Sequence, residues 1–322
     1  MSNFQVYRKT LLFSLVIFLV DLLALALLVG TSAAGFALFN KSTDKALIGL
    51  AVGFLIGIIL VTLIRIFITN RVKAAQIAMM TKGVTENALP DHAFKAGFEE
   101  IKGRFGKITV FFFVTNAIKG IFRQIGRGIN KIGTAVGGDV GNSVTSIIDS
   151  AIQTLIGYLC DCCLGWILFR KDIGAAQAGC EGAVIFFKHG KTLFRNIGRI
   201  FGMGLLSFVL VAGGFFGLSY LVFSSMPGIF ETLSKEVAEA FTRAGEEVPE
   251  IFANPTLFIV VAAALLGIII WSTLHSVLIR PFILVGVLRN FMASGQQDLP
   301  SEKDFAELDG KYPRFAKLHN SI

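Results

Sequence analysis

Four long apolar runs constrain this chain more than any other feature of its sequence. They lie within residues 11–39, 46–69, 202–223 and 255–279. Each supplies the ~20 mostly apolar residues that a helix needs to cross a bilayer. Because lipid offers no water to satisfy backbone groups, such runs must form helices. The sequence therefore predicts an all-α fold, a polytopic integral membrane helix bundle that forms one domain over residues 1–322.

The composition is atypical of soluble proteins. It is 54% hydrophobic and 16% charged, whereas soluble domains are about 25% charged. The net charge is +8, but the cations lie mostly beside apolar runs. That is the pattern of loops at an anionic membrane surface, so we expect lipid rather than nucleic acid as partner. Arg8 and Lys9 precede a first run that is too long for a signal peptide, which predicts an uncleaved span.

The distribution of Lys and Arg predicts the orientation. Cations gather at the N-terminus, in 71–107, in 170–199 and in the tail 292–322, whereas 224–254 holds only two. Cation-rich loops stay in the cytoplasm. We therefore expect a protein of the plasma membrane with both termini cytoplasmic, 224–254 as a polar loop outside and 292–322 as a cytoplasmic tail.

A cationic phrase occurs twice, as KGIFRQIGR from Lys119 and as KTLFRNIGR from Lys191. On a helical wheel each copy separates an apolar face from a cationic one, which is typical of amphipathic helices in the membrane interface. The predicted lipid-contacting cations are Lys119, Arg123, Arg127 and Lys131 in the first copy, and Lys188, Lys191, Arg195 and Arg199 in the second. Alternatively, the cations are simply solvated while the apolar faces pack on neighbouring spans. Duplication and convergence both explain the similarity.

The middle of the chain has two topological solutions. Residues 105–125 and 140–169 either cross the membrane twice, or 140–169 forms a re-entrant or interfacial hairpin with glycine bends, for example at Gly157. At the end of the last run, Pro281 is expected to end or kink the helix.

Polar residues inside apolar runs are the candidate functional sites, because they are costly in lipid. A transport pathway would be lined by Asp21, Asp149, Gln153 and His275. The alternative is that each side chain is packed and hydrogen-bonded locally. Asp21 is the strongest candidate, because its carboxylate falls in the middle of a run.

No pattern in the sequence predicts an enzyme, a cofactor or a metal site. Nucleotide-binding, zinc-protease and nucleophile-elbow motifs are absent. Cys160, Cys162 and Cys163 form a cluster that lacks a second ligand pair at zinc-site spacing. Small apolar packing explains these thiols best, with acylation as the alternative.

The order of these features resembles the C-terminal half of choline transporter-like membrane proteins. The matching residues are Cys160, Cys162 and Cys163, then Arg195, Asn196 and Arg199, with VLRNF at 287–291 as a closing segment. The resemblance covers residues 105–295 and implies a helical transporter. The Asn-Ala-Tyr phrase associated with that family is absent here, so no substrate residue is carried over.

Two functions follow from these observations. The first is a small-solute transporter or channel-like permease, with a small solute or ion as substrate. The second is a non-transporting scaffold or a lipid-binding subunit of a membrane complex. Membrane lipids are partners in both, and either a homo-oligomer or a larger membrane complex is compatible with the sequence.

Overall fold

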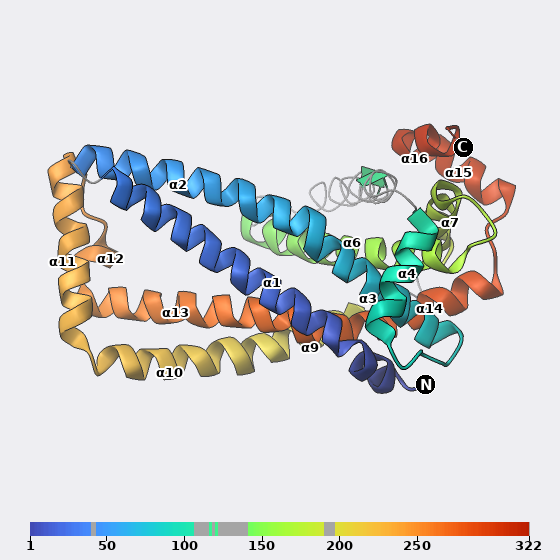
Figure 1. Ribbon diagram of the computed structural model, residues 1–322, viewed down its shortest axis with the longest axis horizontal. Helices are drawn as coiled ribbons and strands as arrows, with labels where there is room; N and C mark the ends of the chain where they lie inside the picture. Colours follow the sequence, from blue (N-terminus) through green and yellow to red (C-terminus); the bar gives the residue numbers. More distant parts are fainter. Residues whose placement is uncertain (40–42, 106–115, 118–119, 122–140, 190–196, 322) are drawn as a thin grey trace. The chain divides into compact units, whose positions relative to one another are not determined.

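The structure is a computed structural model that describes residues 1–321 except 40–42, 106–115, 118–119, 122–140 and 190–196 (Figure 1). Every regular element in these described ranges is a helix, which confirms the predicted all-α fold. Contacts divide the chain into two compact units, unit 1 (Met1–Ile197 with Pro281–Ile322) and unit 2 (Gly198–Arg280). The prediction that residues 1–322 form one domain stays a prediction.

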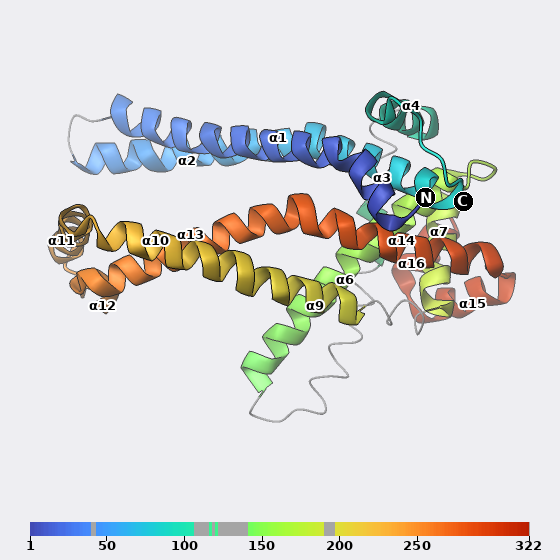
Figure 2. The same cartoon turned by 90° about the horizontal axis from the view of Figure 1, so that it is seen from below.

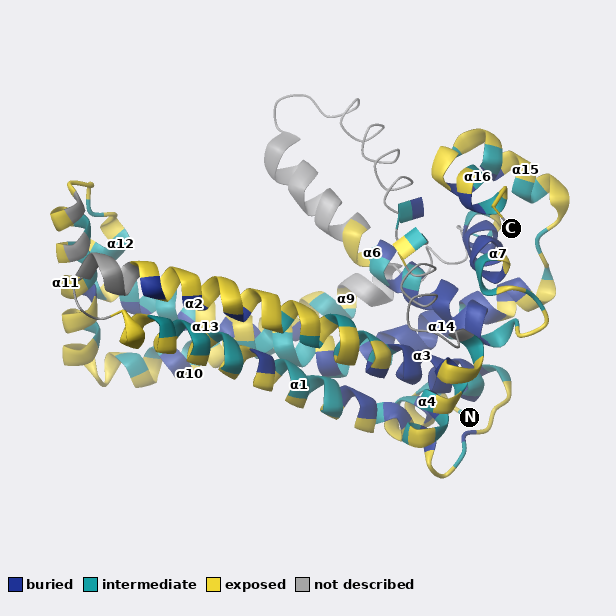
Figure 3. Cartoon of the chain, turned by 45° about the horizontal axis from the view of Figure 1, so that its top comes forward, coloured by how far each residue is buried: buried dark blue, intermediate teal, exposed yellow. Residues whose placement is uncertain are grey.

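Four helices are long and apolar enough to cross a membrane: Asn3–Leu38, Ile48–Thr85, Gly202–Ser224 and Pro255–Gln297. They contain the four apolar runs of the sequence. Large apolar side chains stand exposed along them, and Figure 3 colours the exposed residues of these helices yellow. Contiguous apolar surface of this extent is unfavourable in water and suits a hydrocarbon environment. The chain is therefore a membrane protein.

Unit 1 begins with a hairpin of two of these helices. α1 (Asn3–Leu38) and α2 (Thr43–Ile64) lie side by side (Figures 1 and 2). Glycines permit the close approach, since a Cβ atom on Gly53 would overlap the carbonyl oxygen of Thr31 and one on Gly57 would lie 2.5 Å from the Thr31 hydroxyl oxygen. Helices in lipid associate through such backbone proximity, because the hydrophobic effect does not drive them together there.

Three of the long helices contain a turn of π-helix, a feature that often marks functional positions. The segments are η1 (Arg65–Thr69) between α2 and α3 (Asn70–Thr85), η2 (Phe208–Ala212) between α9 (Ile197–Ser207) and α10 (Gly213–Ser224), and η3 (His275–Ile279) after α13 (Pro255–Leu274). The helix of α13 and η3 continues into α14 (Arg280–Gln297). The sequence allowed Pro281 either to end or to kink the helix, and the continuous helix excludes an end at this residue. The amide that proline lacks falls directly after the π turn, where the regular hydrogen-bond ladder is already interrupted.

The second helix of each hairpin follows the same local pattern. α2 buries Gly53 and Gly57, and α13 buries Ala263 and Gly267. A Cβ atom on Gly267 would lie 2.7 Å from the carbonyl oxygen of Ala212. The spacing from Gly57 to the start of η1 equals the spacing from Gly267 to the start of η3. This correspondence concerns spans and is separate from the repeated cationic phrase.

Around the first turns of α1, unit 1 forms a packed cluster that we call the helical head. It comprises the first turns of α1, then α3, α4 (Ala93–Phe105), the second half of α6 (Gly141–Phe169), α7 (Ala175–Lys188), α14, α15 (Glu302–Lys311) and α16 (Pro313–His319). Its core contains Phe13, Met79, Trp166, Phe291 and Phe315, each less than 2% exposed. Burial of each such side chain contributes about 1.5–3 kcal/mol. In Figure 3 buried residues, drawn dark blue, gather on α3, α7 and α14.

One expectation about this region was wrong. Residues 141–169 form the single helix α6, so the hairpin alternative with a bend at Gly157 does not hold. A glycine inside a helix lowers its stability but does not by itself end it. Within 292–322, α15 and α16 pack on α7, and the cytoplasmic position of this tail stays a prediction. Whether residues 105–169 cross the membrane twice stays open, since most of 105–125 lies outside the described residues.

In unit 2 the connection between spans is largely helical, although its composition suggested a polar loop. α11 (Pro227–Ala244) lies across the ends of α10 and α13, and α12 (Glu250–Ala253) follows it (Figure 1). The Ser234 hydroxyl donates to the carbonyl oxygen of Phe252 at 2.6 Å. Ile229 and Leu233 on a neighbouring face remain exposed. Because glutamates are spread along this segment, its amphipathic pattern was not recognised in the sequence.

The glycine contacts of the first hairpin generate a prediction. Gly53→Ala should destabilise the α1–α2 hairpin by about 1–3 kcal/mol, because the methyl group meets backbone that cannot move without separating the helices. Thermal unfolding in detergent micelles measures the change. Gly30→Ala is the matched control, since nothing lies within 4 Å of a Cβ atom there. Equal effects of the two substitutions would contradict the packing account.

Candidate functional site

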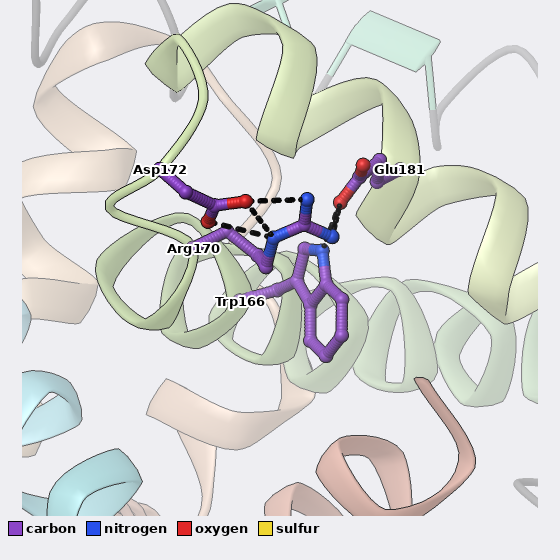
Figure 4. Close-up of polar contacts among 4 residues, drawn as sticks. All are labelled: Trp166, Arg170, Asp172 and Glu181. Carbon is purple, nitrogen blue, oxygen red and sulfur yellow. Dashed lines mark hydrogen bonds and ion pairs between the residues drawn. The ribbon is translucent and has the colours of Figure 1, made fainter. Parts of the chain in front are cut away.

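The most strongly connected polar cluster of the helical head joins the end of α6 to α7 (Figure 4). The indole Nε1–H of Trp166 donates to Oε2 of Glu181 at 2.9 Å, and the Arg170 guanidinium donates to the same oxygen at 2.8 Å. The other edge of the Arg170 guanidinium donates to the Asp172 carboxylate, with Nη2 2.8 Å from Oδ2. The Arg170 guanidinium carbon also lies 5.9 Å from the centre of the Trp166 ring. One arginine thus ties together two carboxylates and an indole.

Burial sets the electrostatics of this cluster. The Glu181 side chain is only 10% exposed, and this burial raises the pKa of its carboxyl, while the Trp166 hydrogen bond and the Arg170 charge lower it. Asp172 is open to water, and the hydrogen bond from Arg170 lowers its pKa. Burying a carboxylate is costly unless it is hydrogen-bonded and paired with a cation, and Oε2 of Glu181 has both kinds of contact. The cluster therefore holds α7 on α6.

A second cluster connects the end of α7 to the C-terminal helices. The Lys188 ammonium lies 2.7 Å from Oδ1 of Asp298 and 3.1 Å from Oδ2 of Asp304. Asp304 also caps α15, since its carboxylate accepts from the Ser301 backbone amide and hydroxyl. The hydrogen bonds from Ser301 are the main cause, with the Lys188 contact, of an Asp304 pKa lowered to about 2. Lys188, predicted to contact lipid, thus has its charge engaged within the protein.

The polar residues of the spans interact inside their own units. The charge of Arg65 in η1 acts on Asp21 of α1 at a distance, and the two form no ion pair or hydrogen bond in the described part of the chain. In unit 2, Nδ1 of His275 lies 3.4 Å from the Ser207 hydroxyl, which accepts a hydrogen bond from the indole of Trp271 at 3.1 Å. The rings of Trp271 and His275 are 5.3 Å apart. His275 thus has a polar partner on the neighbouring helix.

The other predicted residues are not brought together by the described structure. Gln153 is exposed on α6. The side chain of Asp149 lies outside the described residues, as does that of Arg199. The remaining lipid-contact candidates are also outside them: Lys119, Arg123, Arg127, Lys131, Lys191 and Arg195. The transport pathway and the cationic interfacial helices stay predictions.

The cysteines line the packed interior of the head. Cys162, Cys163 and Cys180 are buried, and Cys160 is half-buried. Burial raises the pKa of all three buried thiols, that of Cys180 to about 12. A protonated thiol is a poor nucleophile and a poor metal ligand. Within the described ranges no three His, Cys, Asp or Glu residues form a group that could hold a metal ion.

Sequence reasoning missed Glu181 and Arg170. Arg170 reads as the cation that closes an apolar run, and Glu181 stands alone in the run from Ala178 to Phe186. The available signal was the carboxylate on an otherwise buried helix, which demands a cationic partner nearby.

Comparisons of the chain with protein-family models, curated proteins and solved structures found no match. The resemblance to choline transporter-like proteins therefore stays a hypothesis that rests on short motifs.

The Glu181 contacts predict a stability effect. Glu181→Gln should lower the free energy of unfolding by about 2 kcal/mol, because Arg170 loses one buried counter-charge and keeps Asp172. Glu99→Gln is the control, since its exposed pair with Lys95 contributes little. Thermal unfolding of both variants in detergent gives the comparison. A Glu181→Gln variant as stable as Glu99→Gln would show that the cluster contributes nothing.

Asp304 predicts a pH dependence. Its folded pKa of about 2 lies below the ordinary value of 3.8. A depressed carboxyl pKa gives stability that is present above the ordinary value and lost as the pH falls through the folded value. The wild-type protein should therefore lose stability between pH 4 and about 2, and Asp304→Asn should flatten that part of the profile. Unfolding midpoints measured across this range decide the matter; parallel profiles would refute the assignment.

Proposed function

We propose that this protein is a non-transporting membrane scaffold whose spans hold the helical head at the bilayer surface as a platform for a membrane complex. The observation that carries the proposal is the local contact that His275 makes with Ser207 and Trp271 inside unit 2. The charge of Arg65 acts on Asp21 inside unit 1 without an ion pair. Polar groups that tie neighbouring helices together account for their cost in lipid without a solute route.

The construction of the head supports this proposal. Three helices that carry span residues, α1, α3 and α14, continue directly into its core. Polar contacts fasten them there: Gln76 of α3 donates to the Ser14 hydroxyl of α1 at 2.7 Å, and Arg289 of α14 donates to Asn3 of α1 at 2.7 Å. Because these three helices share one core, a partner bound to the head is mechanically connected to the membrane helices.

The distribution of charge supports a cytoplasmic position for the head. Most described cations lie in it, whereas α11 and its flanks carry Lys235 and Arg243 beside six glutamates. Both ends of the chain pack into the head, α1 through Val6 and α16 through Phe315. By the positive-inside rule the head faces the cytoplasm.

Transport is the second candidate, and one observation favours it. Asp21 lies in a span beside η1, and π turns often mark functional positions in helices. A pathway would need the Asp21 charge, since a carboxylate at that depth is otherwise expensive.

The experiment combines two readouts on the same variants. Extraction from native membranes in lipid nanodiscs should yield assemblies heavier than the protein alone, by mass photometry, with Asp21→Asn retaining them. Charge reversal of exposed head residues, Lys102→Glu with Lys303→Glu, should release the partners. Proteoliposome currents and tracer uptake should be indistinguishable from empty vesicles. A reproducible flux that Asp21→Asn abolishes would overturn the scaffold and establish transport.

A further inference from the structure

A surface pocket of about 370 Å³ lies in unit 1 between the start of α1 and the loop after α3. Its lining includes Gln5, Arg8, Lys9, Asn87 and Leu89. Among the described residues that line it there is no Asp or Glu. Neither Arg8 nor Lys9 makes an ion pair or hydrogen bond within the described part of the chain. Two cations with no acidic neighbour in the pocket produce a local positive potential that attracts an anion.

The walls of the pocket are held in place by other contacts. Gln5 Oε1 accepts from the Ser2 backbone amide in the capping box of α1, which leaves its Nε2 group available as a donor. Asn87 has a positive φ of 55° and turns the chain directly after α3. Arg289 fixes the first turn of α1 through Asn3. The cations therefore project from a fixed rim, which lowers the entropic cost of holding a ligand.

Exposed leucines of α1 follow the pocket residue Arg8 along the helix. Arg8 shares one helix face with Leu12, Leu15 and Leu19, which are 53%, 45% and 60% exposed. The opposite face, with Thr10 and Phe13, is buried in the head. Leu12 follows Arg8 by one turn, about 6 Å along the axis. Positive charge is thus followed by an apolar stripe, in the order in which a phospholipid presents its phosphate and its acyl chain.

We propose that this pocket binds the phosphate group of an anionic membrane lipid, with Arg8 and Lys9 as the phosphate ligands and the leucine stripe along the acyl chain. Guanidinium and ammonium groups form short charge-assisted hydrogen bonds with phosphate oxygens. The stripe identifies a lipid rather than a soluble phosphate compound as the source, because a soluble compound would gain nothing from it. The proposal goes beyond the scaffold function and does not depend on it.

The test measures lipid retention by the full-length protein in detergent, by native mass spectrometry with dioleoyl phosphatidic acid, and thermal midpoints beside it. Arg8→Gln with Lys9→Gln should weaken binding by about tenfold or more, the loss expected when charge-assisted hydrogen bonds are removed. The control Lys102→Gln with Lys317→Gln removes the same charge from other exposed positions of unit 1 and should bind as the parent does. Equal binding by both double variants would overturn the proposal.

Two further ligands test whether binding needs both the phosphate and the acyl chains of the lipid. Dioleoylglycerol, which has the chains without the phosphate, and glycerol phosphate, which has the phosphate without the chains, should each bind at least about tenfold more weakly than phosphatidic acid. Glycerol phosphate that binds as tightly as the lipid would overturn the lipid assignment. If the glutamine variant does not fold, Arg8→Lys with Lys9→Arg preserves both charges and should retain binding; its loss would also count against the pocket.

Discussion

The bilayer forbids unpaired backbone groups, and the arrangement of the long helices depends on that constraint. Long apolar segments must be helical throughout, and they can meet only by close packing of small residues. Gly53 against Thr31 in unit 1 and Gly267 against Ala212 in unit 2 are two instances of this solution. Both lie on the second helix of a hairpin, and both precede a π turn at the same spacing.

Outside the spans the physics changes, because water is available and apolar burial again drives association. The helical head buries Trp166, Phe291 and Phe315, and ion pairs connect its helices. Arg170 joins two carboxylates, and Lys188 joins the capped helix α15 to α7. Arg8 and Lys9 are among the charges that stay unpaired in the described part of the chain, and they lie near the start of the first long helix.

The sequence was a good guide wherever one physical signal dominated. Uninterrupted apolar length predicted the four long helices, and the same signal predicted the all-α class. It failed where two signals overlapped. The glutamates of α11 concealed an amphipathic helix, and glycines in α6 suggested bends that packing does not produce. The helix does not end at Pro281. The π turn directly before this residue already interrupts the regular hydrogen-bond ladder, in which proline lacks a donor.

By itself, then, the sequence determined the environment of this protein and the class of its fold, because hydropathy depends on residue type and run length alone. Only the tertiary structure decided which polar groups meet, because partners such as Glu181 and Arg170, or Lys188 and Asp304, are brought together by helix packing that has no local signature. Asp21 is the instructive case. The sequence marks its carboxylate as costly, and only the fold shows that the cation whose charge acts on it is Arg65 of η1.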